Sequence, residues 1–309
     1  MIIDPNGEDV VILNPQTGEV YDTYKQGIEI RPLETVQQKR DWFQKKQQRE
    51  QETAYIEKHN EQNDIEFGPF IWSVYENSKQ LWPDIQPSFI TMLMFLVTYM
   101  NYRGYLMTPN NQILAKSKLY EYLYVTKQTA YKFCSEMEKY KLLTFKDDKI
   151  FPNPNLFKKD RLDAKFIGMM AENGCNITRL YVEGVRSLYL RNLGVGVKRL
   201  SCVFRILPFV NREYNIVCWN PFETDITKIQ RMKVKDFADS IGLDSSNIQR
   251  LVEDLFEAKF ILRDKPTRFI HYVVFDTMHE EDWGIYVNPN LYYAGSHPKE
   301  VEILGAFDQ

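Results

Sequence analysis

The stretch VTKQTAYKFCSEMEKYKLL, residues 125–143, determines how the rest of the chain is interpreted. Apolar residues recur in it at helical spacing, which predicts a helix with one face in a core: Ala130, Phe133, Met137 and Leu142. Thr126 precedes this run, where its hydroxyl can accept a hydrogen bond from an early backbone N–H and cap the helix. The other face begins with side chains that can contact phosphates or base edges, namely Lys127, Gln128, Thr129, Tyr131 and Lys132.

A short β-hairpin is predicted directly after this helix. The sequence LTF, the turn KDDK and the sequence IF cover residues 143–151, with Lys146 and Lys149 at the tip. A further helix is predicted before it, over about 111–122. Helix, turn, helix and hairpin is the order of a winged helix. An ordinary amphipathic surface helix also satisfies the pattern of 125–143, so both interpretations stay open at this point.

Two more helices are predicted upstream. The sequence FGPFIWSVYENSKQLW, residues 67–82, is interpreted as a helix that ends at Pro83. The sequence FITMLMFLVTYMNYR, residues 89–103, is apolar nearly all round and is predicted to be a buried helix opened by Pro87.

The second half of the chain repeats this plan. Helices are predicted over 179–193, 197–210 and 234–241, followed by a turn at Gly242 and a second helix within 243–261. At an offset of 118 residues and without gaps, Lys132 aligns with Arg250 and Phe133 with Leu251. The sequence NPNL follows both predicted wings, at 153–156 and 288–291. Chance is therefore a poor explanation of the alignment.

The second copy offers its own candidate DNA contacts. Asp244 or Ser245 is predicted to cap its second helix, and the outward side chains of the first turns would meet a major groove: Ser245, Ser246, Asn247, Gln249 and Arg250. Asn and Gln pair bidentately with adenine and Arg with guanine, each worth about 1–3 kcal/mol of discrimination. Lys265 and Arg268 occupy the second wing tip, where cations contact phosphates and position the protein.

Charge is distributed unevenly along the 309 residues. The net charge is only −3, but residues 105–160 carry a net +4 and residues 195–275 a net +3, whereas residues 1–66 and 276–309 each carry −6. Positive charge is therefore concentrated on the predicted helix-turn-helix segments, where local potential matters more than the total.

Several other classes of protein are disfavoured. Four separated cysteines without a CxxC pair indicate neither a metal site nor a disulfide framework, and fit an intracellular protein. Without a long apolar run or a signal segment, we expect no membrane association and a cytoplasmic location. Histidines are scattered singly and no GxxxxGK[ST] loop occurs, so no enzyme activity, cofactor or metal is predicted. The acidic residues after His279 are interpreted as a surface turn.

The expected fold is α+β and mostly helical, with two tandem winged helix-turn-helix domains, a short N-terminal β-hairpin and a charged helical arm. The predicted boundaries are 1–32 for the N-terminal strands, 33–66 for the charged arm or linker, 67–165 for the first winged-helix domain and 166–309 for the second. The arm is interpreted as a connector, as an arm for a partner, or as a means of forming a homodimer.

Three pieces of sequence resemble a known family. They are TGEV at 17–20, Phe67 with Trp72, and YVNPNLYYAGSHPKEVEILGAF at 286–307. They resemble the RepL family, the replication initiators of small Firmicute plasmids and related phage replication proteins. The resemblance covers the N-terminal strands and the C-terminal wing, and the helices only by pattern. A typical member has one winged helix, whereas this chain carries two, as if one unit had been duplicated.

The resemblance implies a sequence-specific protein for double-stranded DNA that binds a plasmid or phage origin and recruits host replication proteins. A phage or plasmid transcriptional regulator would use the same helices. A third hypothesis is a protein-interaction adaptor whose winged helices no longer bind DNA, because both ends of the chain are acidic.

Overall fold

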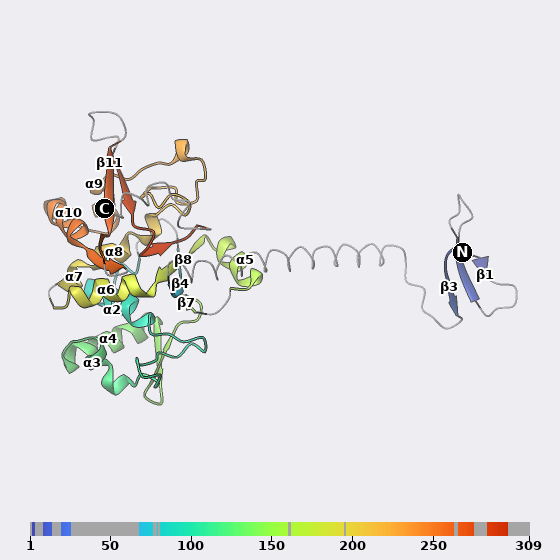
Figure 1. Ribbon diagram of the computed structural model, residues 1–309, viewed down its shortest axis with the longest axis horizontal. Coiled ribbons are helices and arrows are strands. Elements are labelled where there is room, and N and C mark those ends of the chain that lie inside the picture. The colour runs from blue at the N-terminus through green and yellow to red at the C-terminus, as the bar shows by residue number, and fades with distance from the viewer. Residues whose placement is uncertain are drawn as a thin grey trace. The chain divides into compact units, whose positions relative to one another are not determined.

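The fold is α+β, as predicted, and the chain forms two compact units, residues 1–54 and 55–309 (Figure 1). The computed structural model describes residues 2–3, 9–13, 20–25, 68–76, 79, 81–159, 162–194, 196–262, 265–274 and 283–295. The predicted arm over 33–66 lies outside the described residues. The domain boundary predicted at 165 stays a prediction.

The first unit contains a three-stranded antiparallel sheet. Its strands are β1 (Ile2–Ile3), β2 (Asp9–Leu13) and β3 (Val20–Lys25), in the order β1-β2-β3. The predicted pair of N-terminal strands is confirmed, and β1 adds a third strand to it.

A four-stranded antiparallel sheet joins the two halves of the second unit. Its order is β13-β8-β4-β7, with β4 (Phe70–Glu76) and β8 (Cys175–Tyr181) at the centre, and β7 (Phe157–Lys158) and β13 (Tyr292–Tyr293) at the edges. β4 and β8 pair along their whole length, from Phe70 opposite Tyr181 to Glu76 opposite Cys175. Each half therefore supplies one central and one edge strand.

The helix predicted over 67–82 is wrong, because this segment forms β4. The aromatic and β-branched residues of β4 favour a strand. The sequence lacks the alternation of polar and apolar residues that identifies a strand, because both faces of β4 are covered. Ile71 and Tyr75 point into the main core, while Trp72 and Val74 pack against α5 (Ala164–Glu172). The helix predicted over 179–193 is wrong at its start for the same reason, since β8 runs to Tyr181.

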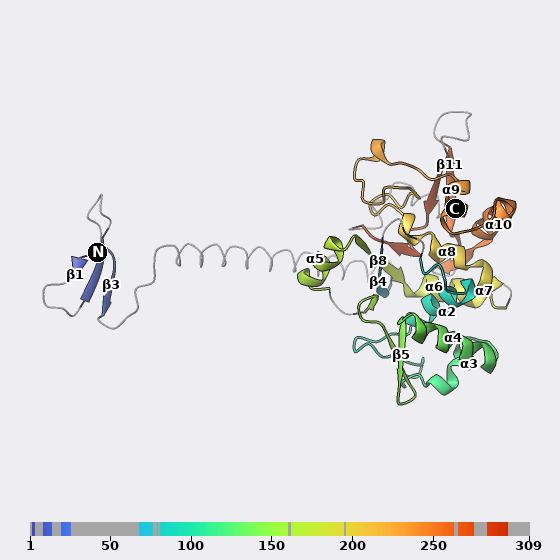
Figure 2. The same ribbon diagram turned by 180° about the vertical axis from the view of Figure 1, so that it is seen from behind.

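Helix α2 (Pro87–Val97) is the buried helix predicted from the apolar run, and every residue from Phe89 to Val97 is buried. It contacts α6 (Val182–Arg191), α7 (Gly196–Arg199) and α8 (Ser201–Arg205) of the second half. Figures 1 and 2 show α2, in cyan, among these yellow helices. One continuous core therefore includes side chains from both halves.

Two other predicted helices are shorter than expected. The helix predicted over 111–122 is limited to a 3-10 turn, η1 (Lys116–Lys118), and α3 (Leu119–Tyr122). Asn111 has a φ of 57°, which is incompatible with a right-handed helix. The helix predicted over 197–210, bent or ended near Pro208, does end before that residue, where α8 passes into the 3-10 turn η2 (Leu207–Phe209), because Pro208 cannot donate a helical hydrogen bond. It is also interrupted at Leu200, between α7 and α8, which the sequence did not predict.

Side chains of the second half donate hydrogen bonds to helix ends of the first. Arg186 donates from Nε to Thr98 Oγ1 and from Nη2 to the Thr98 carbonyl, both at 2.9 Å, at the C-terminus of α2. Its guanidinium also lies 3.9 Å from the ring centroid of Tyr99. Tyr189 Oη donates to the Leu123 carbonyl at 2.7 Å, at the end of α3. These bonds satisfy carbonyls that a helix C-terminus leaves without partners.

The two NPNL sequences form the same pattern of hydrogen bonds, although the carbonyls that accept from the two asparagine amides are not at equivalent positions of the repeat. The Asn153 amide donates to the Lys141 carbonyl, and the Asn288 amide donates to the Arg268 carbonyl, each at 2.8 Å. In both copies the Oδ1 of this asparagine accepts the backbone N–H two residues later at 2.9 Å. In both copies the leucine carbonyl then accepts an N–H from β4 or from Tyr181 at the end of β8. The repeat seen in the sequence thus corresponds to a repeated contact.

Replacing Asn288 by alanine is expected to lower the free energy of unfolding by about 2–3 kcal/mol, because its partners are left buried without hydrogen bonds. Asn288 is fully buried, whereas Asn153 is half-buried. Water can replace the lost bonds in Asn153→Ala, for which we expect a cost of about 1 kcal/mol. Urea denaturation measures the free energy of unfolding of both variants. An equal loss of stability in the two would show that burial of the asparagine does not determine the loss.

Candidate nucleic-acid interface

Helix α4 (Lys127–Lys139) has the cap and the buried stripe predicted for it. Thr126 Oγ1 accepts the N–H of Thr129 at 3.2 Å, and the two threonine hydroxyl oxygens lie 2.9 Å apart. Ala130, Phe133 and Met137 are buried. The stripe anchors α4 and fixes which of its side chains remain outside.

Four of the five predicted contact residues on α4 are exposed. They are Lys127, Gln128, Lys132 and Tyr131, and the Tyr131 side chain is 75% exposed. Thr129 is half-buried, and because its hydroxyl is engaged with the cap, it is less available to a ligand. The Lys127 ammonium lies 5.1 Å from the ring centroid of Tyr120, which holds it near the helix start.

Helix α10 (Ile248–Glu257) is the equivalent helix of the second half, and Leu251 and Leu255 form its buried side. It follows the 3-10 turn η4 (Ser245–Asn247) and, before that, α9 (Val234–Ser240) and Gly242. Asp244 Oδ1 accepts the N–H of Ser246 at 2.8 Å, a bond that lowers the pKa of this carboxyl. The predicted cap therefore stabilises η4, and α10 itself begins without a side-chain cap.

The predicted contact residues of this second helix differ in availability. Ser246, Gln249 and Arg250 are exposed, and Asn247 is half-buried. The Gln249 amide donates to Glu253 Oε1 at 3.2 Å, a bond on the helix surface that can be exchanged. The side chain of Ser245 lies outside the described residues.

The first hairpin, β5 (Leu143–Lys146) and β6 (Lys149–Pro152), carries two exposed lysines at its tip, Lys146 opposite Lys149. Between them Asp147 and Asp148 have φ of 50° and 59°, as a tight hairpin turn requires. The Asp148 carboxylate accepts the Ser117 hydroxyl at 2.7 Å and its N–H at 2.9 Å, which lowers the pKa of Asp148. The tip is thereby bound to η1, close to the start of the helix pair.

The second hairpin, β9 (Lys259–Leu262) and β10 (Lys265–Arg268), has Lys265 at its tip, as predicted. The tip position predicted for Arg268 is wrong, because Arg268 pairs with Lys259 at the base of the hairpin, where both are exposed. The side chain of Lys265 lies outside the described residues. A further strand, β11 (Ile270–Val274), follows this hairpin and pairs antiparallel with β12 (Trp283–Val287). The acidic turn predicted after His279 lies outside the described residues.

One short segment, 84–87, lies between α4 and α10. Glu136 of α4 accepts the backbone N–H of Gln86 at 2.6 Å, just before α2. The next residue, Pro87, lines a pocket together with Arg250 of α10. Lys132 and Arg250, which correspond at the offset of 118, therefore lie on either side of the same segment. Segment 84–87 therefore borders both helices.

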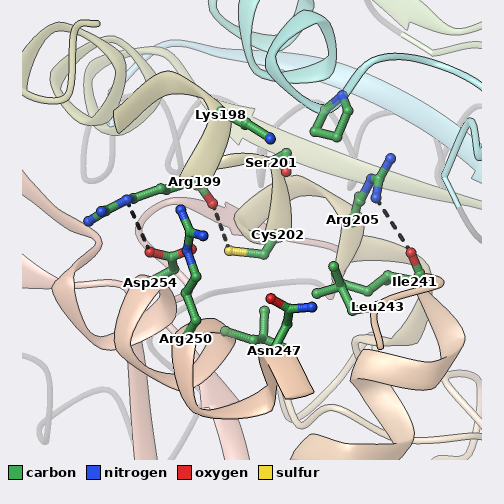
Figure 3. Close-up of a pocket in the computed structure, with 12 residues that line it drawn as sticks. Lys198, Arg199, Ser201, Cys202, Arg205, Ile241, Leu243, Asn247, Arg250 and Asp254 are labelled. Carbon is green, nitrogen blue, oxygen red and sulfur yellow. Dashed lines mark hydrogen bonds and ion pairs between the residues drawn. The ribbon is translucent and has the colours of Figure 1, made fainter. Parts of the chain in front are cut away.

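The pocket beside α10 has a volume of about 290 Å³ and is strongly basic (Figure 3). Its cationic lining residues come from three helices: Lys198 and Arg199 from α7, Arg205 from α8 and Arg250 from α10. Asp254 is the acidic lining residue and lies 3.6 Å from Arg199. It occupies the position that corresponds to Glu136 of α4.

Burial shifts the pKa values of several groups around this pocket. It raises the pKa of Asp254, an effect that Arg199 and Arg250 oppose, and it lowers the pKa of the Arg205 guanidinium. It also raises the pKa of the Cys202 thiol to about 12, so this cysteine is protonated at neutral pH. Cys202 is therefore a weak nucleophile here.

Sequence reasoning did not identify Lys198 and Arg199 as candidate contacts, because they stood inside a predicted buried helix. Two successive cations, two residues after Gly196, were the available signal that this helix begins at the surface. Lys116 and Lys118 of η1 were also not predicted as candidate contacts. The structure places η1 against the tip of the first hairpin, where the Lys116 N–H donates to the Asp148 carbonyl.

Among the residues that the structure describes, no three His, Cys, Asp or Glu side chains gather closely enough to hold a metal ion. Within the same residues, no helix has the length and apolar character needed to cross a membrane. Comparison with protein-family models, with curated proteins and with solved structures finds no match to this chain.

Proposed function

We propose that the chain binds double-stranded DNA sequence-specifically, through two tandem winged helices whose recognition helices are α4 and α10. The observation that carries the proposal is the correspondence between the halves: each has a helix anchored by a buried stripe, with polar residues exposed on its first turns and a hairpin directly after it. In helix-turn-helix proteins these first turns enter the major groove.

The two helices are suited to different contacts. Gln249 and Arg250 of α10, with Asn247, have the side chains that pair bidentately with adenine and guanine. Lys127 and Lys132 of α4 are suited to backbone phosphates, as are Lys146 and Lys149 on the first hairpin. Both helices lie beside segment 84–87, so a single chain offers two contact surfaces.

Initiation of replication at a plasmid or phage origin is the biological role that we propose, on the basis of the RepL resemblance. Transcriptional regulation would use the same surface. A promoter footprint in a host whose plasmid or phage replicates normally without the protein would favour regulation.

The proposal is tested by an electrophoretic titration of the full chain against DNA from its own locus and against random duplexes. We expect one locus fragment to bind at least a thousandfold more tightly than random DNA, as specific binding proteins do by about 10³ or more. Failure to enrich any sequence in a selection from random DNA would reject sequence-specific binding.

Substitutions in the two helices should distinguish recognition of bases by α10 from contacts of α4 with the phosphate backbone. Gln249→Ala is expected to relax preference at one base pair by about 1–3 kcal/mol and to leave the salt dependence unchanged. Lys127→Ala should weaken all sequences alike and reduce the slope of log K against log salt by about 1. Selection from random duplexes at several salt concentrations measures both effects. If Lys127→Ala changed the base preference and Gln249→Ala changed the salt dependence, the proposed roles of α4 and α10 would be exchanged.

A further inference from the structure

We infer that the basic pocket between α7, α8 and α10 binds a phosphate group. Its lining contains the four cations Lys198, Arg199, Arg205 and Arg250 against the single carboxylate Asp254. Asp254 is already paired with Arg199. Within the part of the chain that the structure describes, no carboxylate forms an ion pair with the other three cations. Asp254 also interacts electrostatically with Arg250. The lining as a whole therefore carries three more positive than negative charges.

Arg205 is the strongest indication that this pocket binds an anion. Its side chain is only 7% exposed, and its Nε is buried without a hydrogen-bond partner. Its two other nitrogens reach only carbonyls, Ile241 O at 3.5 Å and Ile85 O at 3.4 Å, both long bonds. A buried guanidinium without an anion is costly, so such residues normally pair with one.

A phosphate group fits this arrangement better than a carboxylate does. Figure 3 shows Lys198 and Arg250 coming from opposite sides of the pocket, from α7 and α10, with Arg205 at a third position. Three oxygens of a phosphate can accept from three directions, whereas a carboxylate accepts in one plane. A phosphate monoester also carries about −1.5 to −2 at neutral pH, which compensates most of the excess.

The pocket is larger than one phosphate ion. A volume of about 290 Å³ is many times the roughly 10–15 Å³ that a cavity needs to hold one water molecule, so the pocket accommodates a phosphate together with part of the molecule that carries it. That molecule is a DNA strand or a free phosphorylated compound. The first source rests on the proposed function, whereas the second is independent of it.

Calorimetric titration of the full chain with pyrophosphate, at constant ionic strength, tests the free source. We expect Lys198→Gln to weaken binding about tenfold, the value of one charge-assisted hydrogen bond. Asp254→Asn should strengthen it roughly two- to fivefold by removing a like charge. Lys165→Gln is the matched control, because Lys165 is an exposed lysine on α5, away from the pocket.

Duplex DNA titrated against the same variants tests the other source. If Lys198→Gln lowers the DNA affinity tenfold and the wild-type chain does not bind pyrophosphate, the pocket binds a DNA phosphate. If the wild-type chain binds pyrophosphate and Lys198→Gln leaves the DNA affinity unchanged, the pocket binds a free ligand. If Lys198→Gln weakens both pyrophosphate and DNA binding, and the two ligands compete, the pocket binds both. If Lys198→Gln matches Lys165→Gln in both assays, the inference is overturned. Should the wild-type chain bind no DNA, the proposed function fails while the pyrophosphate titration still decides the pocket.

Discussion

Replacing Lys132 and Arg250 together by alanine is expected to weaken DNA binding about a hundredfold. Each exposed cation contributes about 1–3 kcal/mol to a base or phosphate contact, and 1.4 kcal/mol corresponds to tenfold in affinity. The residues occupy equivalent positions on α4 and α10, on either side of segment 84–87. Both should therefore contact the same duplex, and titration at several salt concentrations should show a slope reduced by about 1–2.

The two single variants and Lys165→Ala complete this experiment. Lys165 is an exposed lysine on α5 and should leave affinity unchanged. If α4 and α10 bind independently, the losses of the single variants add in the double variant. Unchanged DNA affinity in the double variant would reject this surface. If such a variant also kept its biological function, the adaptor hypothesis would be favoured.

Replacing Phe133 by alanine is expected to lower the free energy of unfolding by about 3–5 kcal/mol. Phe133 is fully buried and meets Phe89 of α2 edge to face, with ring centroids 5.6 Å apart. Because α2 also packs against α6, α7 and α8, the loss should reach the second half as well. Denaturation followed by far-UV circular dichroism should show one transition for residues 55–309, shifted as a whole.

Leu251 is the matched position in the second half, in the same core. Leu251→Ala should cost about 2–5 kcal/mol and shift the same transition. Leu190 is 40% exposed, so Leu190→Ala serves as the control and should cost well under 1 kcal/mol. Two separate transitions, each sensitive to one variant, would instead support independent domains over 67–165 and 166–309.

The second helix of each pair could be predicted from the sequence because local signals mark where it begins. Thr126 marks the start of α4, and Gly242, with a φ of 71°, marks the turn before α10. The buried stripe then has helical spacing in both copies, so one local pattern determines the element and its inner face. The repeated asparagine of NPNL was also informative, since its side chain closes the same turn twice.

The central sheet and the basic pocket could not be predicted, for a common physical reason. β4 is covered on both faces, by the main core and by α5, so its sequence lacks the alternation that identifies a half-buried strand. The pocket combines Lys198, Arg205 and Arg250, which only tertiary packing brings together. Neither property exists within any short window of the chain.

The pairing of β4 with β8 has a consequence for synthesis on the ribosome. β4 ends at Glu76 and β8 begins at Cys175. One edge of β4 therefore has no partner strand until the rest of the first half, α5 and β8 have been synthesised. β8 in turn receives β13 only when Tyr292 and Tyr293 emerge. Until then the nascent chain exposes strand edges that can pair with other chains. Truncated products are therefore the forms of this protein most prone to aggregate.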